Sequence, residues 1–309
     1  MVFPPSVKPG DTVMLVSPSS PLVKDQPVEE LAQLVETLGF RVRVGASCHS
    51  STARGYAAAP PEVRAADIHT GFADPSVRAV WCTRGGSTAW QLLPLLDYDL
   101  IRANPKPLIG FSDVTTLHLA VGQRCGLVTY HGPTANRVFG WGEGDGFSWP
   151  SLCRALGEWE ELAVENPPGE PIVALRPGQA EGRLTGGNLS LVAASLGTPW
   201  QIDARDKILF LEDVGERVYA LERMLCQLRY AGVFDQAAGV VLGDFTRCRN
   251  SYREDYGPGE LVRDFFGDYP KPILSNVRSA HVSPMVTLPM GAWCRVDGEK
   301  GTMVCCRQM

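Results

Sequence analysis

A serine lies where a short apolar run gives way to a helical pattern, in the stretch KPLIGFSDVTTLH at residues 106–118. A glycine turn, then a serine, then a helix start is the arrangement that holds a hydroxyl out as a nucleophile. The same order of residues also suits an ordinary helix N-cap. Ser112 is therefore a candidate nucleophile, and the rest of the sequence must supply a base, an orienting acid and donors for an oxyanion.

The base must come from the five histidines of the chain. Serine is a poor nucleophile unless a base takes its proton, and a third group usually fixes the tautomer of that base. His131 in TYHGPTA and His281 in SAHVSP both follow strand-like runs, and the local pattern does not choose between them. His49, His69 and His118 fit a polar loop, a helix surface and helix packing, respectively.

Candidates for the acid and for the oxyanion donors also follow strand-like runs. Glu212 and Asp213 end KILFLED, where either could reach a base, although LEDVGE could equally cap the next helix. The backbone N–H of Asp113 stands at a helix start, where amides bind negative charge. Gly85 and Gly86 offer a second donor, because a residue without Cβ lets the backbone approach a reacting carbonyl. The glycine pair is also what a simple tight turn needs.

The first half of the chain alternates β-branched runs with helical patterns, which predicts a parallel, doubly wound sheet. Catalytic groups of such sheets gather at the carboxyl ends of the strands, where TRGG and GFSD lie. The expected strands are 11–20, 40–45, 77–86 and 106–111, and the expected helices are 28–39, 60–74, 87–96 and 112–126.

A stretch dense in glycine, proline and acidic residues, between about 136 and 180, marks a domain boundary. The predicted domains are residues 1–165 and 166–309. The second domain mixes its elements in the manner of an α+β or barrel-like fold. Its expected helices are 186–197 and 219–232, and its expected strands are 207–213, 239–245, 287–298 and 302–308.

Composition narrows the classes of function. Of the 309 residues 44% are hydrophobic and 20% are charged, as in soluble globular proteins. A net charge of −5 without charged blocks argues against nucleic acid or an anionic membrane as a partner. The nine cysteines form no C-x-x-C pair, and neither H-E-x-x-H nor a nucleotide-binding glycine motif is present, so we expect neither metal nor cofactor. Without a signal-like or membrane-spanning run, we expect a reducing, cytoplasmic location.

Four stretches resemble, in order and along nearly the whole chain, the LD-carboxypeptidase family of serine peptidases. They are RGGSTAWQLLPLLDYDLIRANPKPLIGFSDVTTLH, GRLTGGNLSLVAASLGTPW, ILFLEDVGERVYALERMLCQLRYAG and SAHVSP…LPMGA. The resemblance implies a Rossmann-like N-terminal domain and a C-terminal domain with β-barrel character. Carried over by motif, it makes Ser112 the nucleophile, Glu212 the orienting acid and His281 the general base. It also implies an oxyanion hole formed by the N–H groups of Asp113 and of the Gly85–Gly86 turn.

Two departures from the family pattern stand out. Ala280 precedes the histidine where many members have glycine, and alanine would be strained if that backbone needed a positive φ. Ser87 and Thr88 follow Arg-Gly-Gly where many members have Tyr-Gly, which concerns substrate contacts.

The resemblance implies hydrolysis of an amide. Muropeptide members remove the terminal D-alanine of a tetrapeptide during cell-wall recycling, need no cofactor and look dimeric. Microcin-immunity members instead cleave an aminoacyl group from a nucleotide-like moiety, and Trp141 and Trp149 are the aromatics available here to stack on a base. A catalytically silent binding protein of the same fold is the third hypothesis. Arg84 and Arg137 are candidates for binding the substrate carboxylate, since guanidinium suits carboxylate.

Overall fold

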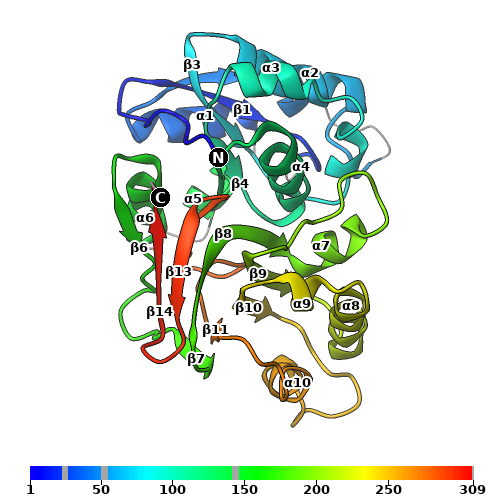
Figure 1. Ribbon diagram of the computed structural model, residues 1–309. Helices are drawn as coiled ribbons and strands as arrows, with labels where there is room; N and C mark the ends of the chain where they lie inside the picture. The colour runs from blue at the N-terminus through cyan, green and yellow to red at the C-terminus, as the bar shows by residue number, and fades with distance from the viewer. Residues whose placement is uncertain (23–26, 50–54, 141–145, 308–309) are drawn as a thin grey trace. The chain divides into compact units, whose positions relative to one another are not determined.

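The computed structural model describes residues 1–22, 27–49, 55–140 and 146–307 (Figure 1). The chain divides into two compact units. The first comprises Met1–Trp159 with Thr287–Gly291, and the second comprises Glu160–Val286 with Ala292–Met309. The sequence-based boundary after residue 165 falls beyond strand β6 (Glu161–Ala163), which pairs within the second unit.

The first unit is built on a six-stranded sheet in the order β12-β5-β4-β3-β1-β2. Its strands are β1 (Thr12–Val16), β2 (Arg41–Val44), β3 (Val77–Cys82), β4 (Leu108–Gly110), β5 (Thr129–His131) and β12 (Leu288–Met290). Strands β1 to β5 are parallel, as the alternating pattern predicts, whereas β12 returns from late in the chain and pairs antiparallel with β5.

The parallel strands are apolar because helices cover the sheet and leave them little contact with water. All three residues of β4 and the last four of β3 are buried. The helices of this unit are α1 (Val28–Thr37), α2 (Pro61–Ala73), α3 (Tyr98–Ala103), α4 (Thr115–Cys125), α5 (Ala135–Gly140) and α6 (Ser148–Leu156).

The strand order reverses between β1 and β3, since β2 lies on one side of β1 and β4 lies beyond β3. In open parallel sheets ligands bind at the carboxyl ends of the strands beside such a reversal. The segments that leave β1, β3 and β4 at this edge carry Ser19, the Gly85–Gly86 pair and Ser112.

The helix expected over 87–96 is wrong. The structure has a 3-10 turn at Ala89–Leu92, and the next α-helix is α3. The N–H groups of Thr88 and Ala89 bond to a buried carboxylate rather than to a helical carbonyl. Pro94 has no N–H with which to continue a helix.

The second unit contains an eight-stranded mixed sheet in the order β6-β14-β13-β8-β9-β10-β11-β7. Strands β8 to β11 are parallel, and β7, β13, β14 and β6 pair antiparallel. Besides β6, the strands are β7 (Val173–Arg176), β8 (Gln179–Asn188), β9 (Lys207–Val214), β10 (Gly239–Thr246), β11 (Ile273–Ser275), β13 (Trp293–Asp297) and β14 (Thr302–Cys306). The helices are α7 (Leu189–Ser195), α8 (Val218–Tyr230), α9 (Val233–Gln236) and α10 (Pro258–Phe265).

The ends of two expected elements also differ from the prediction. The helix expected from residue 186 begins at Leu189, because Gly186 and Gly187 belong to β8 and have positive φ. The run 287–298 divides into β12 and β13, which belong to different sheets. A turn at Gly291, where φ is +91°, separates them.

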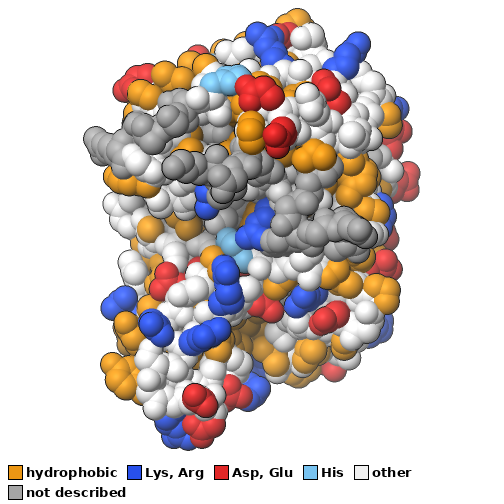
Figure 2. Space-filling view, turned by 180° about the vertical axis from the view of Figure 1, so that it is seen from behind, with side chains coloured by type: hydrophobic (Ala, Val, Ile, Leu, Met, Phe, Trp, Pro, Cys, Tyr) orange, Lys and Arg blue, Asp and Glu red, His pale blue; other side chains and the backbone are white. Residues whose placement is uncertain are grey.

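The chain carries 29 basic and 34 acidic residues. Acidic, basic and apolar side chains are interspersed on the face drawn in Figure 2. Within the described ranges no helix has the length and apolar character needed to cross a bilayer.

Candidate active site

Ser112 lies in a sharp strand-to-helix turn. After β4 the chain is extended at Phe111, turns at Ser112 with φ of +64°, and enters a 3-10 turn (Ser112–Val114) that leads into α4. The left-handed conformation costs a residue other than glycine about 1–2 kcal/mol. The N-cap residues of the two helical turns are Phe111 and Val114, so Ser112 is the N-cap of neither. The turn therefore fits a nucleophile elbow rather than an ordinary N-cap.

Two buried histidines pack behind this turn. The His118 Nε2–H donates to the Gly110 carbonyl at 2.9 Å, and burial lowers the pKa of His118 to about 4. His131, in β5, is fully buried, and its ring lies 6.1 Å from that of Phe111. A histidine enclosed in the sheet in this way supports the elbow from within the core, which removes His131 as a candidate base.

The Gly85–Gly86 turn lies directly against Ser112. A Cβ placed on Gly85 would come 2.9 Å from Ser112 Cβ and 3.1 Å from its Oγ, so a larger residue would collide with the hydroxyl. Gly86 has φ of +148°, and the Ser20 N–H donates to the Gly85 carbonyl at 3.2 Å. Because C=O and N–H point in opposite directions across a trans peptide, the Gly86 N–H is directed away from Ser20. Close contact with Ser112 requires glycine at 85, and the positive φ favours glycine at 86. These are the two residues to which the sequence assigns the second oxyanion donor.

The Asp113 side chain has a role that the sequence did not indicate. Its carboxylate is fully buried and accepts hydrogen bonds from the N–H groups of Thr88 (2.9 Å) and Ala89 (2.8 Å) and from the Ser19 hydroxyl. Only the backbone N–H of Asp113 was expected to matter. The side chain ties the segment after the glycine turn to the elbow.

In the second unit, the imidazole and the carboxylate expected to cooperate are bonded to each other. The His281 Nδ1–H donates to Glu212 Oε2 at 2.9 Å. This bond fixes the neutral tautomer in which Nε2 carries the lone pair and can act as a base. Burial raises the pKa of Glu212, and the neighbouring His281 opposes that rise.

The strands on both sides of β9, β8 and β10, position Glu212. Asn188 stands opposite Glu212 in the β8–β9 register, and its Nδ2–H donates to Glu212 Oε1 at 3.3 Å. A Cβ on Gly186 would lie 2.0 Å from the Phe210 carbonyl oxygen, so β8 can approach β9 this closely only with glycine there. On the other side of β9, a Cβ on Gly243 in β10 would lie 2.9 Å from the Glu212 Cβ, so glycine there leaves room for the Glu212 side chain.

The Asp213 carboxylate bonds to partners other than the histidine, among them Asn188 Nδ2 at 3.0 Å. It also accepts the N–H (2.9 Å) and the hydroxyl (2.7 Å) of Ser190 at the start of α7. Of the two adjacent acids, Glu212 therefore orients the imidazole, and Asp213 holds a helix in place.

The loop that carries His281 is closed at its base. The Val286 N–H donates to the Arg278 carbonyl at 2.7 Å, and the Arg278 N–H donates to Asn166 Oδ1 at 2.9 Å. Ala280 is fully buried and is not among the described non-glycine residues with positive φ. The replacement of glycine by alanine before the histidine therefore introduces no backbone strain.

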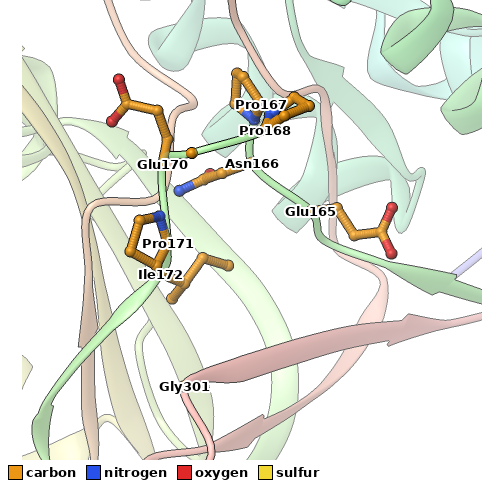
Figure 3. Close-up of a pocket in the computed structure, with 9 residues that line it drawn as sticks. Glu165, Asn166, Pro167, Pro168, Glu170, Pro171, Ile172 and Gly301 are labelled. Carbon is orange, nitrogen blue, oxygen red and sulfur yellow. The ribbon is translucent and has the colours of Figure 1, made fainter.

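A surface hollow of about 440 Å³ lies elsewhere in this unit (Figure 3). It is lined by residues 165–172 and Gly301, with Glu165 and Glu170 directed apart. Neither Glu212 nor His281 lines it. Its connection to the candidate site is Asn166, which holds the base of the His281 loop.

The remaining candidates from the sequence are two arginines for the substrate carboxylate and two tryptophans for stacking on a base. Arg84 is half-buried beside the glycine turn, and its Nη1–H donates to the Pro21 carbonyl at 3.2 Å. Arg137 lies in α5. Trp141 falls outside the described residues. Trp149 stacks on Trp81 with ring centroids 6.1 Å apart, so one face of its ring packs within the first unit.

A serine held in a strained turn at the end of a parallel strand, and a histidine bonded to a buried glutamate, are the components that acyl-transfer hydrolases use. Family comparison makes the class specific. Residues 13–132 match the LD-carboxypeptidase N-terminal domain and residues 181–296 match the LD-carboxypeptidase C-terminal domain. The chain belongs to the LD-carboxypeptidase family, as its motifs predict, and is a peptidase.

Three relatives show the range of the family. The probable murein peptide carboxypeptidase of Bacillus subtilis is 35% identical over 302 residues, which cover 97% of this chain and 93% of the relative. The microcin C7 self-immunity protein MccF of Escherichia coli is 29% identical over 321 residues, covering 93% and 91%. The crystal structure of muramoyltetrapeptide carboxypeptidase from Oxalobacter formigenes superposes with a TM-score of 0.81 at 26% identity, covering 95% of this chain and 97% of that one. The match confirms the fold class.

Proposed function

We propose that the chain is a serine carboxypeptidase that removes the terminal D-alanine from muropeptide tetrapeptides, cutting between the L-centre of a diamino acid and the D-residue. Family membership and the murein-directed relatives support this substrate. The observation that carries the serine mechanism is the strained Ser112 with a glycine turn packed against its hydroxyl. From the family resemblance we also propose that the enzyme works as a cytoplasmic homodimer without a cofactor.

In this mechanism His281 Nε2 takes the Ser112 proton as Oγ attacks the scissile carbonyl. The N–H groups of Asp113 and Gly86 stabilise the resulting oxyanion. His281 then gives the proton to the nitrogen of the departing D-alanine, and the same imidazole activates the water that releases the acyl group. Glu212 holds the Nδ1–H and stabilises the imidazolium in each step.

The test is release of D-alanine from a muropeptide tetrapeptide by the purified protein. We expect Ser112→Ala to fold normally and to lose about 10⁴-fold or more in kcat, because triad members act as a unit. Ser76→Ala is the matched control, since Ser76 precedes β3 at the amino edge of the same sheet. Undiminished D-alanine release by Ser112→Ala would refute the serine mechanism. Absence of D-alanine release by the wild-type protein would instead favour a catalytically silent binding protein.

The microcin-immunity activity is the second candidate, favoured by the similarity to MccF. Of the two aromatics that would stack on a base, Trp149 already has one ring face packed against Trp81. Offering an aminoacyl-sulfamoyl adenylate and a muropeptide tetrapeptide in parallel separates the two activities. Turnover of the adenylate alone would overturn the muropeptide proposal.

A further inference from the structure

Thr88 is held on both sides by opposite buried charges. Its N–H donates to the Asp113 carboxylate at 2.9 Å, and its carbonyl accepts from Arg64 Nη1 at 3.1 Å. The same guanidinium nitrogen also donates to the Thr88 hydroxyl at 3.0 Å. One residue of an otherwise irregular segment is thereby fixed through its N–H, its C=O and its side chain.

The charges that hold Thr88 are fully removed from water. Arg64 and Asp113 both have 0% exposure. Arg64 Nη1 also donates to the Pro18 carbonyl (2.7 Å), while Nε donates to the Ala59 carbonyl (2.8 Å) and Nη2 to Gln91. Buried opposite charges add little net stability compared with well-packed apolar residues, so their presence points to a demand for precise position.

The segment they hold is the one that carries the glycine turn. Its upstream end is anchored where the Thr83 N–H donates to the Val16 carbonyl at 2.8 Å, and its downstream end is anchored at Thr88. Between these anchors, Gly85 and Gly86 have the freest backbone of any residue type. A catalytic hydrogen-bond donor must nevertheless be held within a few tenths of an ångström of its working place. The position of the glycine turn therefore depends on these two anchors and on the Ser20 N–H, which donates to the Gly85 carbonyl.

We propose that the Asp113 carboxylate and the Arg64 guanidinium are positioning residues that hold the Gly85–Gly86 turn at the oxyanion site beside Ser112. The assignment deepens the proposed function and rests on it. Asp113 thus serves twice, with its N–H as an oxyanion donor and its carboxylate as the anchor of the second donor. Neither side chain contacts the substrate in this arrangement. Losing the anchor therefore weakens stabilisation of the transition state and leaves ground-state binding intact.

The first measurement is the division between kcat and KM for D-alanine release. The Asp113→Asn substitution removes the charge, but its amide oxygen can still accept from the N–H groups of Thr88 and Ala89. We therefore expect kcat to fall about 10-fold. Asp113→Ala removes the anchor, and we expect a loss of about 100-fold, the usual cost of one oxyanion donor. KM should stay within about threefold in both variants. Arg64→Lys, which keeps the charge but not the planar fork, should also lower kcat and not KM.

Asp67→Asn is the matched control. Asp67 is another buried carboxylate of the same unit, and it accepts the N–H groups of Ala46 (3.0 Å) and Ser47 (2.7 Å) instead of those after the glycine turn. We expect it to lose a similar amount of stability and to keep its kcat. An unchanged kcat in Asp113→Asn and Arg64→Lys, or an equal loss in Asp67→Asn, overturns the positioning role. If Asp113→Ala does not fold, these milder variants decide the question.

A probe that needs no peptide substrate separates this inference from the proposed function. In labelling by an alkyl fluorophosphonate, Ser112 Oγ forms a bond to phosphorus, the P–F bond breaks, and the serine proton leaves with fluoride. The phosphoryl oxygen gains negative charge in the same hole. We expect Asp113→Asn to label at least several-fold more slowly than wild type, and Asp67→Asn to label at the wild-type rate.

The outcomes fall into distinct cases. Labelling at Ser112 without D-alanine release would refute the proposed muropeptide activity. The labelling rates of the variants would then decide whether Asp113 and Arg64 position the glycine turn. Equal labelling rates of wild type and Asp113→Asn would refute the positioning role of Asp113 and leave the proposed function standing. A wild-type protein that neither labels nor releases D-alanine removes both proposals.

Discussion

Ser112 adopts a backbone conformation that glycine would adopt more readily. With φ of +64° it is one of four non-glycine residues with positive φ in the described ranges. Strain of this kind concentrates at functional sites, because the surrounding structure must enforce it. Here β4, the buried histidines behind it and the Asp113 anchor enforce the turn, so that a hydroxyl can occupy it.

This strain makes a prediction about stability. We expect Ser112→Gly to be more stable than Ser112→Ala by about 0.5–1 kcal/mol, because relief of the left-handed strain exceeds the extra chain entropy of glycine. Urea unfolding of the two variants, both expected to be inactive, measures the difference. The same pair at Ser76, where φ is negative, should show the opposite order. A less stable glycine variant at 112 would contradict the strain argument.

Glu212 makes a second prediction at the same scale. Burial raises its pKa, so the folded chain binds the proton more tightly than the unfolded chain does, and stability falls as pH rises through the folded pKa. Glu212→Gln removes the buried charge and keeps an oxygen that can accept from His281. We expect its stability at pH 7 to equal or exceed that of wild type, while kcat drops by about 10⁴ because the tautomer and the imidazolium lose their support. Thermal unfolding and D-alanine release, measured together, test this, and substantial retained activity would count against the orienting role.

At the scale of elements, the parallel strands could be predicted because strands that are buried on both faces of a sheet consist of nearly continuous apolar residues. The expected helix over 87–96 is wrong, since the bonds that interrupt it come from Asp113, a partner distant in sequence. The choice of Glu212 over Asp213 was also beyond local pattern. Asn188 in β8 contacts both acids, and the choice depends on the partners that the rest of the fold brings to each, His281 to Glu212 and Ser190 to Asp213.

The glycine turn supplies a prediction about elements. In Gly85→Ala the new methyl would lie 2.9 Å from Ser112 Cβ and must push the turn or the serine aside. We expect a loss of at least about 100-fold in kcat with the fold retained, because a donor or the nucleophile leaves its place. Gly122→Ala is the control, since its Cβ would meet only the Leu127 carbonyl at 4.0 Å within α4. That change should stabilise the helix by about 0.5–1 kcal/mol and leave turnover unaltered.

At the scale of the whole molecule, the buried His118 makes the unfolding free energy depend on pH. Burial holds its folded pKa at about 4, whereas the ordinary value is 6.5. Between those values the unfolded chain binds a proton that the folded chain does not, so stability falls as pH decreases from 6.5 to 4. The decrease amounts to roughly 3 kcal/mol at most.

His118→Gln tests this pH dependence. Its side-chain amide can still donate to the Gly110 carbonyl but does not titrate. Urea unfolding from pH 7 to pH 4 should give a shallower decline than in wild type. The exposed His49, replaced in the same way, should leave the wild-type decline unchanged. Parallel curves for wild type and His118→Gln would contradict the prediction.

Strand β12 has a consequence for what happens when the chain is cut. Its three residues come from late in the sequence, yet they complete the edge of the first sheet by pairing with β5. A protease that nicked the backbone between Trp159 and Glu160 would produce two polypeptides, and the later one would still contribute a strand to the sheet of the earlier one. The nicked protein should therefore migrate as one species until it is denatured, and an exchange of either half between relatives has to carry this strand along.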